Sequence, residues 1–498
     1  MIELLRIIYK RLTASGSTAE QALQSGIWVA GINVADRILQ LLKIVVLARL
    51  LSPAAFGILG IALLAITALR QFSKLGFDEA LIQHQDDDVD AYLNTAWVMK
   101  IIRGFGIAVV AFLAAPYLAV FFGEAQAEPV IRVIGTTPLI LSLQNPGVMY
   151  FQKNLNFHKE FVYQVGGRLV DLVVAVVLAL IFRSVYALVA GIVAMNCVKF
   201  VISYGIHEYR PKIEFDYAYG KEMFGFGKWL LVSGILVFLY GQGDDAFVGW
   251  FFGASSLGIY QLAYRFSNAP ATEVTHVISR VAFPTLSKVQ NDTEKLREGF
   301  RRGVQLSTTV AFPMAAGIAA VAPQFVPVVL GDLWRPAIPV MQVLAVWGGV
   351  RAFGANVGPV YNSTGRPDIG ARVQTLKVIT IIIIIYPAAE SFGLAGVALA
   401  IVMSSCISLP VSLYYVLSIT QERVIELFKL IIYPLTSSIG MAGGVVILDT
   451  YVLVGTNLPN LISLIISGTI LYILLMILFE YLFDAEFTKL YYLVENSI

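Results

Sequence analysis

The sequence predicts an all-α polytopic membrane protein with about fourteen transmembrane helices and no separate soluble domain. Of its 498 residues, 58% are hydrophobic and only 14% are charged, and the mean hydropathy is +0.76. A soluble domain carries roughly 25% charged residues, so this chain has too few to cover a water-facing surface. Because a spanning helix needs about 20 mostly apolar residues, short connections leave room for about fourteen spans.

The apolar segments and the turn residues between them place the individual spans. Most connections are short, so neighbouring helices are expected to run antiparallel. The expected spans are 25–50, 54–74, 92–121, 129–151, 160–182, 185–207, 223–251, 255–285, 300–321, 336–361, 370–388, 392–418, 427–449 and 459–482.

The distribution of Lys and Arg predicts the orientation in the membrane. With the N-terminus inside, the outer connections hold only Arg183 and Arg335, and the inner ones hold all the other bases that lie between spans. The connection 78–90 is rich in acids, which contribute little to the positive-inside rule. We therefore expect a multi-pass protein of the cytoplasmic membrane with both termini in the cytoplasm.

An internal repeat predicts the domain organisation. Ala54–Ala62 resembles Ser255–Ala263 at an offset of 201 residues, and Gly147–Tyr150 resembles Gly358–Tyr361 at an offset of 211. Two parallel six-helix copies would explain both matches, as in transporters built from parallel repeats. The expected parts are a cytoplasmic segment (1–24), a first six-helix lobe (25–208), a cytoplasmic linker (209–222), a second six-helix lobe (223–418), two further spans (419–483) and a cytoplasmic tail (484–498).

Basic residues outnumber acids inside the expected spans. Each charge at the bilayer centre costs at least about 2.5 kcal/mol if it faces lipid, so the deeper bases should face protein or a watery cavity. Bases near span ends can instead reach the headgroups, which is the interpretation for Arg49, Arg70, Lys199, Arg280 and Lys377. The candidates for a cationic substrate-binding cavity are Arg37, Lys43, Arg103, Arg168, Arg265 and Arg351.

Polar stripes at helical spacing support such a cavity. The alternative is that the stripes form packed pairs between helices, for example Arg168 with Asp171 one turn away. Lys43 matches Asp244 in the repeat, so Lys43 with Asp244 or Asp245 is a candidate outer gate. A hydrogen-bonded knot, or a proton or sodium site at the two acids, is the other interpretation. The candidate cavity and gate residues are Asn33, Asp36, Gln40, Asp244, Asp245, Gln261 and Asn268.

The sequence offers no pattern for catalysis, a metal or a cofactor. Cys197 and Cys406 lie in apolar segments, and the four histidines are scattered, so neither a zinc site nor a disulfide framework is expected. The formal net charge of +2 argues against a nucleic-acid partner. The last two spans differ from the rest, because Asp449 is the only charge between Ile431 and Phe479. That surface is suited to lipid, or to the tail of a lipid.

Several short motifs stand out in the two expected lobes. They are Leu47–Pro53 followed by Phe56 and Gly57, then Leu257–Tyr260, Ala263–Arg265 and Arg280–Ser287. These motifs resemble those of a known family, the polysaccharide and oligosaccharide-lipid flippases, which form the Wzx/PST branch of the MOP superfamily beside MurJ and the MATE drug exporters. The resemblance implies an alternating-access flippase for a polyprenyl-pyrophosphate-linked oligosaccharide, with Asp36, Arg37 and Arg265 at cavity-like positions.

Two other classes of function compete with this interpretation. A MATE-like multidrug or cation antiporter would need acids in its cavity, and the excess of bases argues against it. A membrane polysaccharide polymerase or ligase would need active-site residues in a sizeable outer loop, whereas the longest outer connection, 322–335, has no His and no paired carboxylates. The expected partners of a flippase are membrane lipids, a polysaccharide polymerase and other assembly proteins.

Overall fold

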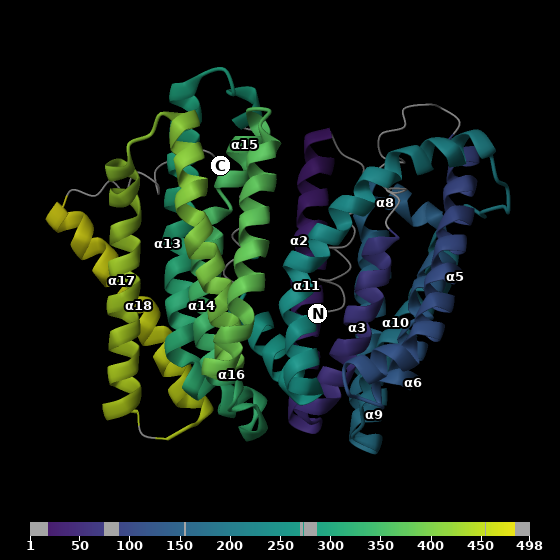
Figure 1. Cartoon of the computed structure of the whole chain (residues 1–498), viewed down its shortest axis with the longest axis horizontal. Helices are drawn as coiled ribbons and strands as arrows, with labels where there is room; N and C mark the ends of the chain where they lie inside the picture. Colours follow the sequence, from purple (N-terminus) through teal and green to yellow (C-terminus); the bar gives the residue numbers. More distant parts are fainter. Residues whose placement is uncertain are drawn as a thin grey trace. The chain divides into compact units, whose positions relative to one another are not determined.

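The computed structural model describes residues 18–73, 89–153, 156–268, 272, 286–453 and 455–483. All regular elements within these ranges are helices (Figure 1). Ten of the described helices are long and apolar enough to cross a membrane. The predicted class, an all-α multi-pass membrane protein, is confirmed, and the count of fourteen spans stays a prediction. The expected N-terminal segment up to residue 17 and the tail 484–498 lie outside the described residues.

The chain folds into two compact units, Met1–Gly258 and Ile259–Ile498. The first contains α2 (Thr18–Leu50), α3 (Pro53–Phe72), α5 (Val89–Phe121), α6 (Ala127–Ile134), α7 (Thr137–Ser142), η1 (Pro146–Met149), α8 (Tyr150–Lys153), α9 (Phe157–Phe182), α10 (Val185–Ile206) and most of α11 (Tyr217–Ser267). The second contains the end of α11, then α13 (Thr293–Phe325), η2 (Val326–Leu330), η3 (Asp332–Trp334), α14 (Ala337–Gly354), α15 (Val357–Ser363), α16 (Pro367–Thr420), α17 (Val424–Tyr451) and α18 (Leu458–Phe483).

Two long helices contain glycine breaks that separate expected spans. Gly253 in α11 has a φ of 81° and Gly393 in α16 has a φ of 60°, a backbone region that favours glycine. Residues eight apart in a straight helix would be separated by about 12 Å. A Cβ on Gly396 would nevertheless lie 1.9 Å from the carbonyl oxygen of Ala388. The chain therefore reverses at Gly393, one residue into the expected span 392–418 and shortly after the end of the expected span 370–388.

The expected span 129–151 is not one continuous helix. The segment consists of α6, α7, η1 and α8, with breaks at Gly135 and around Asn145. Pro138 and Pro146 lie in the first turns of α7 and η1, where a missing N–H is tolerated. Proline is unfavourable inside a helix because it removes a hydrogen bond and clashes with the preceding turn. The prediction of a single helix was wrong because apolarity was given more weight than these prolines.

The two copies of the repeated motif contact each other through their matching glycines, Gly57 and Gly258. Each copy starts a helix after a break, α3 at Pro53 and the later part of α11 after Gly253. A Cβ on Gly57 would lie 1.6 Å from the carbonyl oxygen of Ala254, and a Cβ on Gly258 would lie 2.1 Å from that of Pro53. Small residues allow helix backbones to approach closely in membranes. The glycines that match in the repeat therefore form the two sides of one helix crossing.

The segment between α10 and α11 is hydrogen-bonded to α5 near the N-terminal end of that helix. Asn94 in α5 donates to Glu214 Oε2 at 3.0 Å, and its Oδ1 accepts from Tyr209 Oη at 2.7 Å and from the Lys212 amide at 3.0 Å. Thr95 accepts from the amide of Asp216 at 3.1 Å. Residues 207–216, most of which fall in the expected linker, are thus an ordered strap on this unit.

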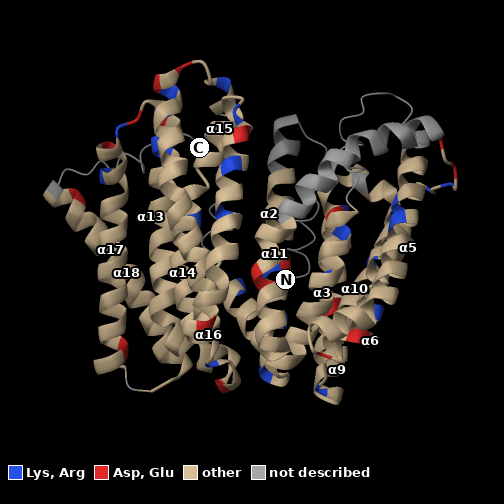
Figure 2. Cartoon of the chain, viewed as in Figure 1, with Lys and Arg blue, Asp and Glu red and all other residues tan. Residues whose placement is uncertain are grey.

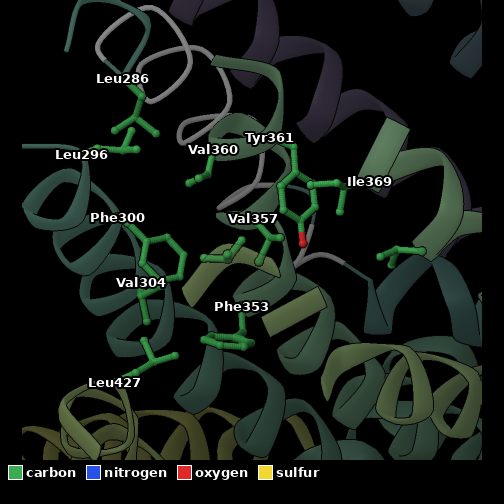
Figure 3. Packing of buried hydrophobic residues seen from close by; sticks show 12 residues of the cluster. Leu286, Leu296, Phe300, Val304, Phe353, Val357, Val360, Tyr361, Ile369 and Leu427 are labelled. Atoms are coloured by element: carbon green, nitrogen blue, oxygen red, sulfur yellow. The ribbon is translucent and has the colours of Figure 1, made fainter. Parts of the chain in front are cut away.

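A hydrophobic core joins five helices of the second unit at one end. It draws side chains from α13, α14, α15, α16 and α17, and Figure 3 shows them from close by, with Ile369 beside Tyr361. The Tyr361 hydroxyl donates to the backbone oxygen of Ser412 at 2.6 Å, so the only polar atom of this ring is paired in the core. The buried members are Leu286, Leu296, Phe300, Val304, Phe353, Val357, Val360, Tyr361, Ile369, Val373, Val416 and Leu427.

Candidate functional site

Charged side chains are sparse along the described helices, which Figure 2 shows as mostly tan ribbon. Sparse charges make any cluster inside the helices informative, because isolated charges in a membrane are costly. The described part of the first unit contains a cluster of bases and carboxylates on α2, α9 and α10. It includes three bases and two carboxylates, namely Lys43, Arg168, Lys199, Asp36 and Asp171.

Arg168 in α9 is held between two carboxylates. Its Nε donates to Asp36 Oδ1 at 2.6 Å and its NH2 group donates to Asp36 Oδ2 at 3.3 Å. Two parallel bonds of this kind give the guanidinium a fixed orientation. Its NH1 group also lies 3.6 Å from Asp171 Oδ2, one turn along α9. The packed Arg168–Asp171 pair that the spacing suggested is therefore present on α9, and a second helix, α2, contributes Asp36.

Asp171 is the most deeply buried member of the cluster, with 1% of its surface exposed. Lys43 Nζ in α2 donates to its Oδ1 at 2.5 Å. A Cβ on Gly191 in α10 would lie 2.7 Å from the same oxygen, so only a glycine leaves room for the carboxylate there. Burial of this charge depends on its two basic neighbours, since an unpaired buried carboxylate is strongly destabilising.

Lys199 in α10 belongs to this cluster, although its position in the sequence suggested a side chain that reaches the headgroups. Its Nζ donates to Gln164 Oε1 at 2.6 Å and lies 5.1 Å from the centre of the Tyr163 ring. It is also close enough to interact electrostatically with Arg168 and Asp36. The sequence signal that could have placed Lys199 in the cluster is the stripe of Gln164, Arg168 and Asp171 on α9. Such a polar stripe needs polar partners on the next helix, and Lys199 lies on that helix.

The second unit brings together two of the predicted residues, Arg351 and Asn268. Arg351 in α14 donates from NH1 to Asn268 Oδ1 at 3.0 Å, and its guanidinium carbon lies 5.0 Å from the centre of the Trp347 ring. Trp347 is in turn fixed by an Nε1 bond to Ser405 Oγ at 3.0 Å. Lys377, also expected to reach the headgroups, interacts electrostatically with Arg351.

The other predicted residues are placed individually. Arg103 lies apart from the cluster in the first unit and donates to Ser73 Oγ at 3.1 Å and to the backbone oxygen of Arg70 at 2.7 Å. Lys43 binds Asp171 in this structure, and its pairing with Asp244 or Asp245 stays a prediction. Asp244 is buried, Arg37, Gln40, Asp245 and Gln261 are partly buried, and Asn33 and Arg265 are exposed within their units.

An apolar pocket of about 520 Å³ lies within the second unit, among α13, α17 and α18. Its lining contains no charged residue, and its polar hydroxyls are Thr469 and Tyr472. Tyr472 donates to the backbone oxygen of Thr309 at 2.8 Å, and Thr469 donates to that of Ile465 at 2.8 Å. Both hydroxyls are therefore satisfied by the protein, which leaves a surface suited to a hydrocarbon chain.

Relatives of known name cover most of the chain. It is 27% identical over 403 residues to the lipopolysaccharide biosynthesis protein WzxC of Escherichia coli (strain K12), covering 80% of this chain and 82% of that one. It is 25% identical over 380 residues to the teichuronic acid biosynthesis protein TuaB of Bacillus subtilis (strain 168), covering 76% and 78%.

Solved structures of transporters share the fold. The lipid II flippase MurJ in an inward closed conformation superimposes with a TM-score of 0.72 at 13% identity, covering 90% of this chain and 98% of that one. An inward-facing multidrug resistance MATE transporter of the MOP superfamily gives 0.63 at 15% identity, covering 78% and 94%. The family described as polysaccharide biosynthesis protein matches residues 46–339, more than half of the sequence. The chain is therefore a multi-pass membrane protein that belongs to the polysaccharide biosynthesis protein family.

Proposed function

We propose that the chain is a flippase that moves a polyprenyl-pyrophosphate-linked oligosaccharide, the repeat unit of a polysaccharide, across the cytoplasmic membrane. The observation that carries the proposal is the cluster of Lys43, Arg168 and Lys199 inside the first unit, in a family named for polysaccharide biosynthesis. A relative with 24% identity over 316 residues, the probable low-salt glycan biosynthesis flippase Agl15 of Haloferax volcanii, is also named as a flippase, which favours the same function for this chain. The protein is a transporter and not an enzyme.

The ion pairs suggest how the cluster handles an anionic headgroup. Asp36 and Asp171 neutralise two positive charges while the site is empty, which removes the cost of unpaired charges in the membrane. A pyrophosphate offers Arg168 the same bidentate geometry as a carboxylate and carries more charge. The headgroup can therefore replace a carboxylate on a base as the lobes alternate between inward-open and outward-open states. Arg37, Arg265 and Arg351 are the further bases assigned to headgroup binding.

The apolar pocket of the second unit is our candidate for the lipid tail. Gly317 in α13 lines this pocket, and a Cβ there would meet only the Met441 methyl group, at 3.7 Å. Replacing Gly317 by Phe would therefore place a ring at the pocket wall with no clash at its Cβ. We expect transport to fall at least about tenfold, since each displaced CH₂ group forgoes about 0.8 kcal/mol of burial.

The matched control for the tail pocket is Gly443→Phe, because Gly443 is exposed on α17, has open space around it and does not line the pocket. Equal transport by the two variants, measured in the same liposomes, would reject the tail assignment. A loss confined to Gly317→Phe would support it.

The principal test is transport of a fluorescent polyprenyl-pyrophosphate oligosaccharide in liposomes, with its accessibility followed in each leaflet. We expect the native protein to flip this lipid, and we expect Arg37→Ala and Arg265→Ala to lose most of the activity while still inserting and folding. Absence of flipping, together with export of a hydrophobic cation by the same vesicles, would favour a MATE-like antiporter instead. Size-exclusion chromatography of both purified variants distinguishes loss of transport from misfolding, because a folded variant elutes as a single peak at the volume of the native protein.

A further inference from the structure

A second cavity of about 550 Å³ lies in the first unit, between α3, α5 and the strap 207–216. All of its lining side chains are apolar except Ser73 and Arg103. The lining is Leu69, Phe72, Ser73, Met99, Ile102, Arg103, Gly106, Ile107, Val110 and Phe215. Its volume is in the range of small-molecule sites, roughly 300–1,000 Å³. The cavity is separate from the cluster around Arg168 and from the apolar pocket of the second unit.

The polar groups gather at one end of this cavity. Arg103 is positioned by the hydrogen bonds that it donates to Ser73 Oγ and to the backbone oxygen of Arg70. Both acceptors lie at the C-terminal end of α3. Arg70 lies close enough to Arg103 for the two guanidinium groups to interact. Lys100 lies one turn before Arg103 on α5 and therefore on the same side of the helix. Like charges held close together favour an anion at this end.

The apolar groups extend from that end along α5. Arg103 and Val110 are separated by about 10 Å along the helix axis, and one leaflet of the hydrocarbon core is about 15 Å thick. Ile102 and Val110 are exposed at the surface of the unit, so the cavity is a groove open to the side. Its basic end is the end of α5 that carries Asn94 and the strap. A molecule with an anionic head and a hydrocarbon chain matches both ends of the groove.

We propose that this groove is a binding site for an anionic phospholipid, with its phosphate at Arg103 and Arg70 and an acyl chain along Leu69, Ile107 and Val110. The site lies on the inner leaflet in the orientation that the Lys and Arg distribution predicts. Phe215 belongs to the strap that leads into α11, so the bound lipid also contacts this strap. Anionic lipids of the inner leaflet would then stabilise the docked strap.

The test is native mass spectrometry of the full chain in detergent, titrated with phosphatidylglycerol and, separately, with phosphatidylcholine. We expect phosphatidylglycerol to bind about tenfold more tightly. Both lipids carry an anionic phosphate, but the choline cation of phosphatidylcholine would be repelled by Arg103 and Arg70, whereas the glycerol of phosphatidylglycerol is neutral. Gly106→Leu should abolish retention of both lipids, because Gly106 lines the groove and a Cβ added there would have no atom within 4 Å. Leucine also favours the helix by up to about 1 kcal/mol relative to glycine, so folding is not at risk.

Two further variants separate specific binding from general contact with lipid. Arg103→Gln should remove the preference for the anionic lipid and keep the weaker binding of phosphatidylcholine. Gly443→Leu adds the same side chain to an exposed position on α17 and should bind as the native protein does. Equal retention of lipid by native protein, Gly106→Leu and Gly443→Leu would show annular lipid only and overturn the proposal. Displacement of phosphatidylglycerol by a stoichiometric amount of polyprenyl phosphate would overturn it too, because the groove would then belong to the transported lipid.

Discussion

Replacing Lys43 by Met is expected to destabilise the protein and to abolish transport. The variant leaves Asp171, whose side chain is 2% exposed, with Arg168 at 3.6 Å as its remaining salt-bridge partner. Removing one partner of a buried ion pair costs about 3–5 kcal/mol, because the other charge stays buried without compensation. The unfolding temperature of the purified protein in detergent should therefore fall clearly below that of the native protein.

A second change at the same pair separates stability from transport. Adding Asp171→Asn to Lys43→Met removes both charges and keeps the size of both side chains, and the Asn oxygen can still accept from Arg168. We expect the unfolding temperature to recover, since replacing a whole buried pair by neutral groups is often close to neutral. Transport of the lipid-linked oligosaccharide should not recover if Lys43 binds the pyrophosphate. Recovery of both properties would mean that the pair is only structural, and it would reject carboxylate exchange at this site.

The identity of the buried partners was only partly predictable from sequence. Spacing along one helix suggested Arg168 with Asp171, because side chains three residues apart share a face. The bonds from Lys43 to Asp171 and from Arg168 to Asp36 join different helices. A pattern within a helix specifies which face is polar, but the rotation of the next helix decides which residues meet there.

For two of the five bases assigned to the headgroups, the sequence missed the partner for the same reason. Lys199 and Lys377 were expected to reach the headgroups because of their distance from the end of a span. In the structure Lys199 bonds to Gln164, and Lys377 interacts with Arg351. Distance from a span end measures depth alone, whereas the partner depends on what the adjacent helix presents at that depth.

Helix breaks followed a simpler local rule. Gly253 and Gly393 break long apolar helices at positive φ, and the boundaries of expected spans had been placed beside both residues. Pro138 and Pro146 interrupt the segment 129–151 in the way that their missing N–H requires. The positions of glycine and proline in the sequence are therefore sufficient to locate these breaks. This includes the interruption of the segment 129–151, which was expected to be a single span. The partners of buried charges needed the tertiary structure.

Adding a single methyl group to the repeated glycine motif at Gly57 is expected to destabilise the protein strongly. In Gly57→Ala the added Cβ would lie 1.6 Å from the carbonyl oxygen of Ala254, and the atoms it meets are backbone atoms that no rotamer change can move. The helices must separate, and we expect a loss of more than about 3 kcal/mol, the upper end of ordinary overpacking costs. The fraction of protein that remains folded after heating in detergent measures this loss.

The control variant for this helix crossing is expected to raise stability instead of lowering it. Gly31→Ala adds the same methyl group to α2 where no atom lies within 4 Å, so the higher helix propensity of alanine should raise stability by up to about 1 kcal/mol. Gly258→Ala should resemble Gly57→Ala, since its Cβ would lie 2.1 Å from the carbonyl oxygen of Pro53. Because both methyl groups force apart the same two backbones, the double variant should cost less than the sum of the single variants. Additive losses would show that the two glycines act at independent contacts and that the repeat does not form a single crossing.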